Sequence, residues 1–564
     1  MPEFDLPRAD ILDVIGKGLT EADLIDAHRL GPNARLRRIE REPLLETTWH
    51  VLAEAAAEIP DQVAWNFFEQ DAAMTYQEAL AAVNRLAGGL QAIGIGSGSH
   101  VAIMLPNVPA FPIAWLAISR LGAVMVPVNA RYTAEELAYV LNDSDSEFLI
   151  IDGQFLEILA KVEIKPAALS DTNIIVHDGP AGGARRSFEA VAALGQPDFD
   201  PGYPVSAQAL LNIQYTSGTT GFPKGCMLRQ CYWTATAKVA AERDGIVTKT
   251  VLAHQPFFYM DPQWMMLMAF YQRGTVFIAN GPSATRFMDW VRRYKIQTCI
   301  LPEVVYRQPA HPDDAQNDLR RAAIYNVRKE VHAEMEKRFA VQAREAFGMT
   351  EVGSTLFTPL EATDMVGSGT CGIPVAFRET RVVDDDGQDV PQGEIGELIV
   401  RGPTILLGYY NKPEATKESF FGEWFRTGDL FRQDERGFHY IVGRKKDMIR
   451  RSSENIAARE VEVALMRMEA VEEAAVVAVP DPARGEEVKA YIILQDGFTP
   501  EDAPPEKILQ HAEEYLAVFK VPRYVTYRDE LPRTPSLKVK KVELKAEAED
   551  LRLGAFDRVD GVWR

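Results

Sequence analysis

Short apolar runs that alternate with helix-like segments constrain the fold of this chain most. The runs in its N-terminal part have the length and composition of buried strands: VAIML (101–105), VMVPV (124–128) and FLII (148–151). Two of the neighbouring segments open with a capping box, Thr75 with Glu78 and Thr133 with Glu136, and this pattern starts helices. Buried strands separated by helices predict parallel sheets that are covered by helices on both faces.

A chain of 564 residues is longer than one hydrophobic core usually covers. The segment 384–402 has the pattern of a β-hairpin with acidic turn residues. After residue 450 the pattern is that of a compact α+β unit: helix 457–468, strands 474–479 and 488–494, helix 506–518 and strand 523–528. We therefore divide the chain at about residue 445, into a large domain (1–444) and a small domain (445–564).

The net charge of −20 argues against nucleic acid as a partner, because so acidic a surface repels phosphate. The cysteines form no CxxC pair and no zinc spacing: Cys226, Cys231, Cys299 and Cys371. Free thiols in a reducing cytosol are the simplest interpretation. The N-terminal residues lack a signal-peptide pattern, and no apolar stretch has the length of a membrane span. We predict a cytoplasmic protein without an integral membrane contact.

The segment YTSGTTGFPKG (215–225) directly follows the apolar run LLNIQ. It combines hydroxyl side chains, glycines and one lysine: Thr216, Ser217, Thr219, Thr220, Gly218, Gly221, Gly225 and Lys224. Glycines let backbone N–H groups approach phosphate oxygens, hydroxyls add donors, and the lysine adds positive charge. We predict a phosphate-binding loop, with a flexible surface loop as the alternative. It is not the P-loop of kinases, because Pro223-Lys224-Gly225 replaces Gly-Lys-Ser/Thr.

This loop resembles the signature loop of the adenylate-forming superfamily, which includes acyl-CoA synthetases, peptide-synthetase adenylation domains and luciferases. Further segments resemble other motifs of that family, in the same order: AFGMTE (346–351), RTGDL (426–430), GRKKDMI (443–449) and PRTPSLK (532–538). The segments 256–270, 301–322 and 322–339 are most similar to the crotonobetaine/carnitine–CoA ligase branch.

The resemblance covers most of the chain and implies an α/β fold. Residues 1–444 would form an AMP-binding (adenylation) domain of helix-flanked sheets with a small β-rich subdomain. Residues 445–564 would form a small, mobile α+β lid. The implied function is an ATP-dependent acid–CoA ligase that forms acyl-AMP and diphosphate and then acyl-CoA. ATP, Mg²⁺ and coenzyme A are the implied cofactors.

The resemblance also assigns roles to residues that bind the nucleotide. The β- and γ-phosphates would be held by Thr216, Ser217, Gly218, Thr219, Thr220, Gly221 and Lys224. Phe347 would stack on adenine, and Asp429 and Arg444 would contact the ribose. Thr350 would contact the α-phosphate.

Three more residues would act on charge and movement. Glu351 would hold Mg²⁺, a hard cation that suits a carboxylate. Lys538 would bridge the α-phosphate and the leaving oxygen, where a cation favours the transition state over the ground state. Lys446 would be the pivot about which the lid turns between the two half-reactions.

Each of these residues also has a structural interpretation. Asp429 could be a turn residue, and Glu351 could be a solvated acid near a helix start. Lys538 lies in a lysine-rich stretch (538–545), for which a solvated basic face is an alternative, and Lys446 could be an ordinary exposed lysine. We prefer the functional interpretation because the motifs occur together and in register.

Two segments depart from the family pattern. The family's GGEN is here Ser452-Ser453-Glu454-Asn455, and because serine carries a Cβ that opposes positive φ, we expect a differently shaped loop. Ser536-Leu537-Lys538 stands where the family has Thr-Gly-Lys. Both changes concern the thiol-transfer step more than the adenylation step.

Aromatic and acidic residues cluster near residue 260: Phe257, Phe258, Tyr259, Asp261 and Trp264. Such a cluster could bind a quaternary-ammonium acid, because cations are attracted to aromatic ring faces. We expect most of these side chains to pack in the core instead. Tyr259 and Asp261 remain our candidates for the pocket that binds a small carboxylic acid.

Two other functions remain open at this point. One is an adenylating enzyme that loads a carrier protein, and the other is a non-catalytic nucleotide-binding relative. A hydrolase is disfavoured, because the sequence contains no GxSxG or HExxH motif. A small acid, ATP and coenzyme A are the expected partners. The sequence leaves the oligomeric state open, with a homodimer as one possible assembly.

Overall fold

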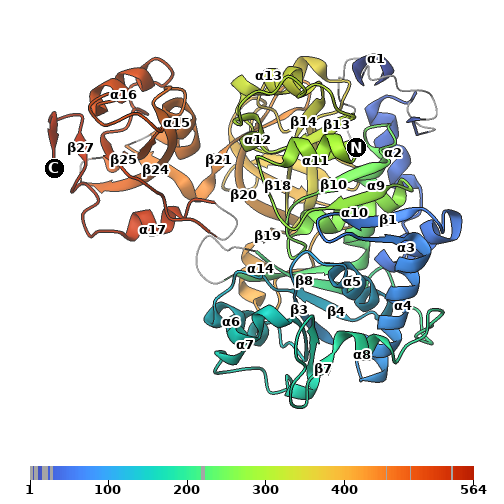
Figure 1. Ribbon diagram of the computed structural model, residues 1–564. Coiled ribbons are helices and arrows are strands. Elements are labelled where there is room, and N and C mark those ends of the chain that lie inside the picture. Colours follow the sequence, from blue (N-terminus) through green and yellow to red (C-terminus); the bar gives the residue numbers. More distant parts are fainter. Residues whose placement is uncertain are drawn as a thin grey trace.

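The computed structural model describes residue 4 and residues 11–15, 23–25, 29–216, 223–452, 454–482, 484–534 and 538–564. Its elements form four sheets with helices packed against them (Figure 1). The predicted α/β class is confirmed.

One sheet has seven strands in the order β7-β6-β5-β3-β4-β8-β9. Their bounds are β3 (His100–Met104), β4 (Val124–Pro127), β5 (Phe148–Asp152), β6 (Ile174–His177), β7 (Arg186–Ser187), β8 (Leu210–Thr216) and β9 (Lys224–Arg229). All neighbours are parallel except β8 and β9, which are antiparallel. The three strands predicted from apolar runs are β3, β4 and β5, so these predictions are confirmed.

Helices accompany this sheet: α4 (Tyr76–Ala92), α5 (Ala110–Leu121), α6 (Ala134–Asp143), α7 (Leu156–Ala160) and α8 (Phe188–Ala192). Both predicted capping boxes are present, at Thr75 with Glu78 and at Thr133 with Glu136. Each box fixes where its helix begins, because the side chains satisfy backbone N–H groups that the helix leaves free.

A nine-stranded sheet has the order β16-β15-β14-β13-β12-β10-β11-β1-β2. Its bounds are β1 (Val63–Phe67), β2 (Ala72–Thr75), β10 (Thr250–Ala253), β11 (Thr275–Ile278), β12 (Thr298–Ile300), β13 (Arg321–Ile324), β14 (Gln342–Met349), β15 (Gly353–Phe357) and β16 (Ile373–Pro374). The helices α9 (Gln230–Glu242) and α10 (Met260–Tyr271) pack on each other, and α10 packs on β10. The core between the elements includes the fully buried Trp65, Trp115 and Trp233.

The remaining helices of this part are α1 (Ile11–Ile15), α2 (Pro32–Arg41), α3 (Thr48–Glu58), α11 (Phe287–Arg293), α12 (Glu303–Tyr306), α13 (Lys329–Phe339) and α14 (Pro413–Glu418). The helix α2 is fixed by a buried ion pair of 2.6 Å between Arg35 and Glu361. The helix α2 therefore belongs to the packed body of the molecule.

A five-stranded sheet consists of β17 (Glu379–Val383), β18 (Gly396–Arg401), β19 (Phe420–Phe421), β20 (Trp424–Gln433) and β21 (His439–Arg444). β17 and β18 are antiparallel neighbours, joined by the acidic segment that predicted a hairpin. That prediction is confirmed.

The chain then passes through the short helix η5 (Lys445–Asp447) into a separate seven-stranded sheet. Its strands are β22 (Met448–Arg451), β23 (Glu454–Ala457), β24 (Val471–Asp481), β25 (Gly485–Leu494), β26 (Tyr524–Tyr527), β27 (Phe556–Asp557) and β28 (Val562–Trp563). The helices α15 (Ala458–Leu465), α16 (Pro505–Glu513) and α17 (Lys541–Ala546) accompany it. This part has its own hydrophobic core and forms the orange-to-red body in Figure 1.

In the part of the chain that the structure describes, no helix combines the length and apolar character that crossing a bilayer requires. All four cysteines are free and buried.

Candidate active site

The predicted phosphate-binding loop lies between β8 and β9. Ser217, Gly218, Thr219, Thr220 and Gly221 fall outside the described residues, but both ends of the loop are described. Thr216 and Lys224 lie opposite each other in the antiparallel ladder. The Lys224 ammonium nitrogen is 4.9 Å from the centre of the Tyr409 ring. The loop ends are thus held together, with the lysine beside them.

A polar clamp fixes both ends of this loop. The carboxylate of Asp143 accepts a hydrogen bond of 2.9 Å from the Tyr215 hydroxyl and pairs with the ammonium of Lys412. The hydroxyl of Tyr139 donates to the carbonyl of Pro223 over 2.9 Å. Tyr215 precedes the loop and Pro223 follows it, so α6, which carries Tyr139 and Asp143, contacts both sides of the loop.

Thr350 and Glu351 lie in the turn between β14 and β15. The Tyr409 hydroxyl donates to a carboxylate oxygen of Glu351 over 3.0 Å, and the Tyr232 hydroxyl donates to the carbonyl of Thr350 over 2.9 Å. Glu351 is 7% exposed, which contradicts a solvated helix-start acid. Burial raises the pKa of its carboxyl, while Tyr409 opposes that shift.

Asp429 and Arg444 are paired residues on the neighbouring strands β20 and β21. The Arg444 Nε lies 2.7 Å from Asp429 Oδ1. Asp429 is 1% exposed, so it is not an exposed turn residue, and its Oδ2 has no hydrogen-bond partner among the described residues. Burial raises the pKa of Asp429 to about 6, against the attraction of Arg444. A buried carboxylate oxygen without a donor suits a ligand hydroxyl.

Phe347 lies on β14 and is half-buried. Its ring meets that of Phe431 edge-on, with 5.0 Å between the ring centres. This contact fixes the ring orientation while part of Phe347 remains accessible.

Lys538, from the C-terminal part of the chain, belongs to the same electrostatic environment. Desolvation by neighbouring protein atoms lowers the pKa of its ammonium most, and the positive charge of Arg444 lowers it further. The side chain is nevertheless exposed to solvent. The carboxylates of Asp429, Glu351 and Asp261 act in the opposite direction. Residues far apart in the sequence therefore bring a cation and several acids to one place.

Tyr259 and Asp261 occupy the start of α10 and are half-buried. The Trp264 indole N–H donates to Asp261 Oδ1 over 3.1 Å, and burial raises the pKa of Asp261. Phe257 and Phe258 are buried in the core, which confirms the packing interpretation for these two rings. An aromatic cage made of the whole cluster is therefore excluded.

Lys446 lies in η5, between the sheet that ends with β21 and the sheet that begins with β22. It is exposed, whereas its neighbour Lys445 pairs with Asp385 at 2.7 Å and Glu397 at 3.0 Å. Its exposure agrees with an ordinary surface lysine. A role as a pivot would therefore depend on its backbone rather than on its side chain.

Ser452, the first residue of the segment that replaces the family's GGEN, has an unexpected backbone conformation. Ser452 adopts a φ of 57°, in the left-handed region that serine was expected to oppose. The expectation that serine opposes positive φ at this position is wrong, and a loop shape different from that of the family stays a prediction. Ser453 and the triplet 535–537 lie outside the described residues, as do the side chains of Glu454 and Asn455.

Comparison with known proteins identifies the family. The AMP-binding enzyme model matches residues 52–410, and the model of the AMP-binding enzyme C-terminal domain matches residues 460–538. The chain belongs to the AMP-binding enzyme family. The predicted relationship to the adenylate-forming superfamily is confirmed.

Similar proteins support this assignment. The crotonobetaine/carnitine–CoA ligase of Salmonella heidelberg (strain SL476) is 32% identical over 481 residues, which cover 82% of this chain and 91% of that protein. ATP-bound MatB from Rhodopseudomonas palustris has a TM-score of 0.80 and 26% identity, covering 90% of this chain and all of that chain (100%). The anthranilate CoA ligase AuaEII with anthranoyl-AMP shares the fold, with a TM-score of 0.81 at 24% identity and coverage of 90% and 98%.

This member of the AMP-binding enzyme family is an AMP-forming acid–thiol ligase, and its cofactors are ATP, Mg²⁺ and coenzyme A. The residues present fit the cation. Mg²⁺ usually binds one or two carboxylates together with phosphates and waters. Glu351 provides a fixed carboxylate, and across the described ranges no group of three His, Cys, Asp or Glu side chains forms a ready-made metal cage.

Three residues that contact the predicted site were missed from the sequence: Asp143, Tyr232 and Tyr409. Each acts through a contact between distant segments, so no local pattern shows that contact. The one available signal was the pair Tyr409-Tyr410 directly after Gly408.

Proposed function

We propose that ATP binds with its phosphates at the loop between β8 and β9 and its ribose at Asp429 and Arg444. In the first half-reaction, an oxygen of the acid attacks the α-phosphorus, the bond to the bridging oxygen of the β-phosphate breaks, and diphosphate leaves. In the second, the sulfur of coenzyme A attacks the acyl carbon, the thiol proton is released, and AMP leaves.

One feature supports this proposal most strongly: Glu351 and Asp429 of the N-terminal part lie near enough for their charges to raise the pKa of Lys538 of the C-terminal part, against the lowering by burial and Arg444. Joining two anions requires fixed positive charge at the reacting phosphate. Lys538 would supply that charge at the α-phosphate, next to a contact from Thr350. The exposed Lys538 keeps its ammonium accessible to a ligand.

The other residues would position the nucleotide. Thr216, Ser217, Gly218, Thr219, Thr220, Gly221 and Lys224 would hold the β- and γ-phosphates. Phe347 would stack on adenine, and the unpartnered Oδ2 of Asp429 would accept from a ribose hydroxyl. Glu351 would hold Mg²⁺, which supplies positive charge to the phosphate oxygens when it is bound.

We further propose that residues 1–444 act as the adenylation domain and residues 445–564 as a lid that turns at Lys446. The separate sheets on the two sides of η5 support this division. A single segment that links two independently packed bodies can absorb the dihedral change of such a turn.

The acid is proposed to be small, with Tyr259 and Asp261 lining its pocket. Asp261 also favours a second class of substrate, quaternary-ammonium acids, because a carboxylate near Lys538 would attract a cationic substituent. The relative named crotonobetaine/carnitine–CoA ligase gives the same indication.

The decisive measurement is acid-dependent exchange of labelled diphosphate into ATP, followed by mass spectrometry of the product formed with coenzyme A. Purified protein is offered a panel of short monocarboxylic, dicarboxylic, quaternary-ammonium, aromatic and fatty acids. Exchange with at least one acid is expected, and Lys538→Ala should reduce it by on the order of 100-fold or more. Lys545→Ala, a change within the same lysine-rich stretch, is the matched control and should retain exchange.

No exchange with any acid would overturn the proposal and favour a non-catalytic relative. Exchange without an acyl-CoA product would instead support a carrier protein as the thiol acceptor. These two results separate adenylation from thiol transfer.

We also propose a cytoplasmic location, which the four free, buried cysteines support because thiols persist in reducing compartments. A homodimer is the assembly to test first, by light scattering of the purified protein. A monomer mass at working concentration would exclude it.

A further inference from the structure

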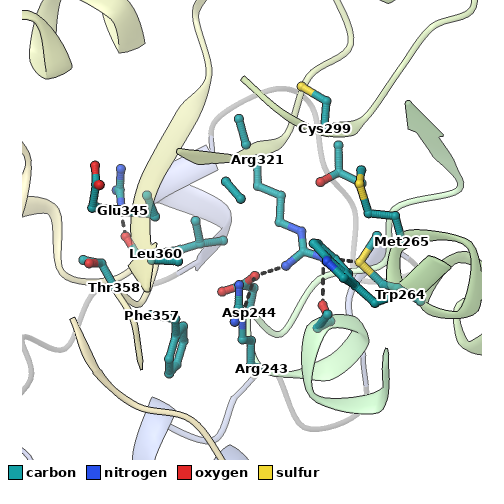
Figure 2. A pocket seen from close by; sticks show the side chains of 17 residues that line it. Arg243, Asp244, Trp264, Met265, Cys299, Arg321, Glu345, Phe357, Thr358 and Leu360 are labelled. Carbon is teal, nitrogen blue, oxygen red and sulfur yellow. Dashed lines mark hydrogen bonds and ion pairs between the residues drawn. The ribbon is translucent and has the colours of Figure 1, made fainter. Parts of the chain in front are cut away.

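A small internal cavity lies between the nine-stranded sheet and the helices α9 and α10 (Figure 2). Its volume is about 30 Å³, which is room for one or two water-sized groups. Trp264, Met265 and Met268 of α10 form its apolar side, together with Cys299 of β12. The lining also contains charged and polar side chains, among them Arg243, Arg321 and Arg344, which is unusual for a cavity enclosed by core elements.

Several buried donors that line this cavity lack a hydrogen-bond partner. They are Arg243 Nε, Arg321 Nε, Arg344 Nε and Thr358 Oγ1, none of which has a hydrogen bond among the described residues, although Arg243 Nε lies at an ion-pair distance of 3.8 Å from Asp244 Oδ2. All four residues are more than nine-tenths buried. Buried donors without acceptors are costly, so the arrangement is suited to a group that brings oxygen acceptors.

The positive charge around the cavity also exceeds its negative charge. Arg321 pairs with Asp244, and Arg344 pairs with Glu336. Arg243 lies 3.8 Å from the same Asp244 and donates to the Ser354 hydroxyl over 3.0 Å. Figure 2 shows the guanidinium of Arg321 directed at Asp244, next to Arg243. Arg243 and Arg321 thus share one carboxylate.

Glu345, the other acidic residue that lines the cavity, does not offset the excess of positive charge at neutral pH. Burial raises the pKa of Glu345 to about 8, so the neutral carboxyl form predominates. Burial lowers the pKa of Arg243 and lowers that of Arg321 to about 9. A buried cation without its own counter-charge is unfavourable, and an anionic group would relieve the cost.

The cavity adjoins the proposed acid site. Trp264 lines the cavity and also donates a hydrogen bond to Asp261, whose charge acts to raise the pKa of Lys538. Ala346 lines it from β14, next to Phe347, the residue proposed to stack on adenine. If the reacting carboxylate of the acid meets the α-phosphate near Lys538, the far end of a short acid would reach this cavity past Trp264.

We infer that the cavity binds a second carboxylate, so that the preferred substrate is a short dicarboxylic acid. This inference rests on the proposed function and narrows its substrate class. Arg243 and Thr358 donate to the distal carboxylate, and the small volume excludes long acyl chains. A quaternary-ammonium end group would meet like charge at Arg243 and is disfavoured at this end.

The test compares acids of equal chain length with and without the distal carboxylate: succinate against butyrate, and glutarate against pentanoate. Acid-dependent diphosphate exchange gives kcat/KM for each acid in the wild-type protein. Hydrogen bonds to charged groups predict a preference for the dicarboxylic acid on the order of 10- to 100-fold. Arg243→Met should reduce this ratio toward one, and Thr358→Val should reduce it by a smaller factor.

The matched control is Arg320→Met, because Arg320 precedes Arg321 but pairs with Asp23 at 2.8 Å, away from the cavity. The ratio of kcat/KM for the dicarboxylic acid to kcat/KM for the monocarboxylic acid should be the same in this variant as in the wild type. A second readout is binding: glutarate with AMP should raise the melting temperature of the wild type more than pentanoate does, and Thr358→Val should weaken that difference.

Butyrate and pentanoate used as well as their dicarboxylic partners would overturn the inference and leave the ligase function intact. A preference for carnitine over glutarate would also overturn it. Absence of exchange with every acid would contradict the proposed function itself. If Arg243→Met fails to fold, the wild-type ratio and Thr358→Val still decide.

Discussion

Asp429 combines a buried carboxylate with an oxygen that lacks a protein donor. Its folded pKa of about 6 lies above the ordinary value of 3.8, so its contribution to stability is full below pH 3.8 and is lost as the pH rises through 6. Asp429→Asn should therefore stabilise the ligand-free protein at pH 7 by about 2 kcal/mol. The same change should raise the KM for ATP about tenfold through loss of an ionic acceptor.

Melting curves at pH 4 and pH 7, together with KM values for ATP and for the acid, check this prediction. The gain in stability should appear at pH 7 and be small at pH 4. A variant that is less stable at pH 7, or one with an unchanged KM for ATP, would show that Asp429 is only a structural acid.

Glu351 should control the Mg²⁺ requirement. Glu351→Gln keeps the size of the side chain and removes its charge, so the Mg²⁺ concentration for half-maximal exchange should rise about tenfold or more. Tyr409→Phe, which removes the hydrogen bond to Glu351, should give a smaller rise. A Mg²⁺ titration of diphosphate exchange measures both, and equal requirements in all three proteins would exclude the metal role.

At the scale of elements, α6 is expected to act on ATP binding through the ends of the phosphate loop. Asp143→Asn weakens the contacts to Tyr215 and Lys412, so the loop ends should be held less firmly. We expect a three- to tenfold rise in the KM for ATP with little change in the KM for the acid. Initial-rate measurements with each substrate varied in turn separate the two values.

The control for this clamp is Tyr410→Phe, which removes a hydrogen bond to the neighbouring Asp145 and should leave both KM values near those of the wild type. Equal changes in the two KM values of Asp143→Asn would indicate general loosening of the fold.

Local sequence predicted elements well where their boundaries depend on neighbouring residues. Thr75 and Thr133 each start a helix through a residue three positions later, so both boxes were visible in the sequence. Ser452 was misjudged, because its positive φ depends on its surroundings, including a backbone hydrogen bond to Arg484. Intrinsic preference is a weak guide where tertiary contacts fix a backbone.

The motifs led to proposals for the main site residues, because their order and spacing follow a known family. Contacts between distant segments could not be predicted in the same way. Tyr409 reaches Glu351 across 58 positions, and Arg321 reaches Asp244 across 77. The cavity of Figure 2 arises only when helices and strands from separate segments pack together, so the sequence showed its residues without showing that they meet.

For the whole molecule, two buried histidines set the response to acid. Burial lowers the pKa of His254 and of His439 from 6.5 to about 4. Between these values the unfolded chain binds more protons, so stability is full above pH 6.5 and falls as the pH drops toward 4. Each histidine should contribute up to about 3 kcal/mol to this loss.

Urea unfolding midpoints at pH 7.5 and pH 5 measure the effect. His254→Gln keeps a donor for the carbonyl of Ile300, which lies 3.3 Å from Nε2, and should reduce the pH dependence. His311→Gln, at a side chain that is 59% exposed, is the control and should retain the full dependence. An identical pH dependence in all three proteins would mean that other groups govern acid unfolding.

The pairing of Asp429 with Arg444 across β20 and β21 has a consequence for the order of events in catalysis. Both residues precede Lys446 in the chain, whereas Lys538 follows it. A rotation at Lys446 would carry the lysine away while the ribose remained anchored to the stationary side. The adenylate would then stay bound to the N-terminal part while the C-terminal part reorients and brings the thiol to it.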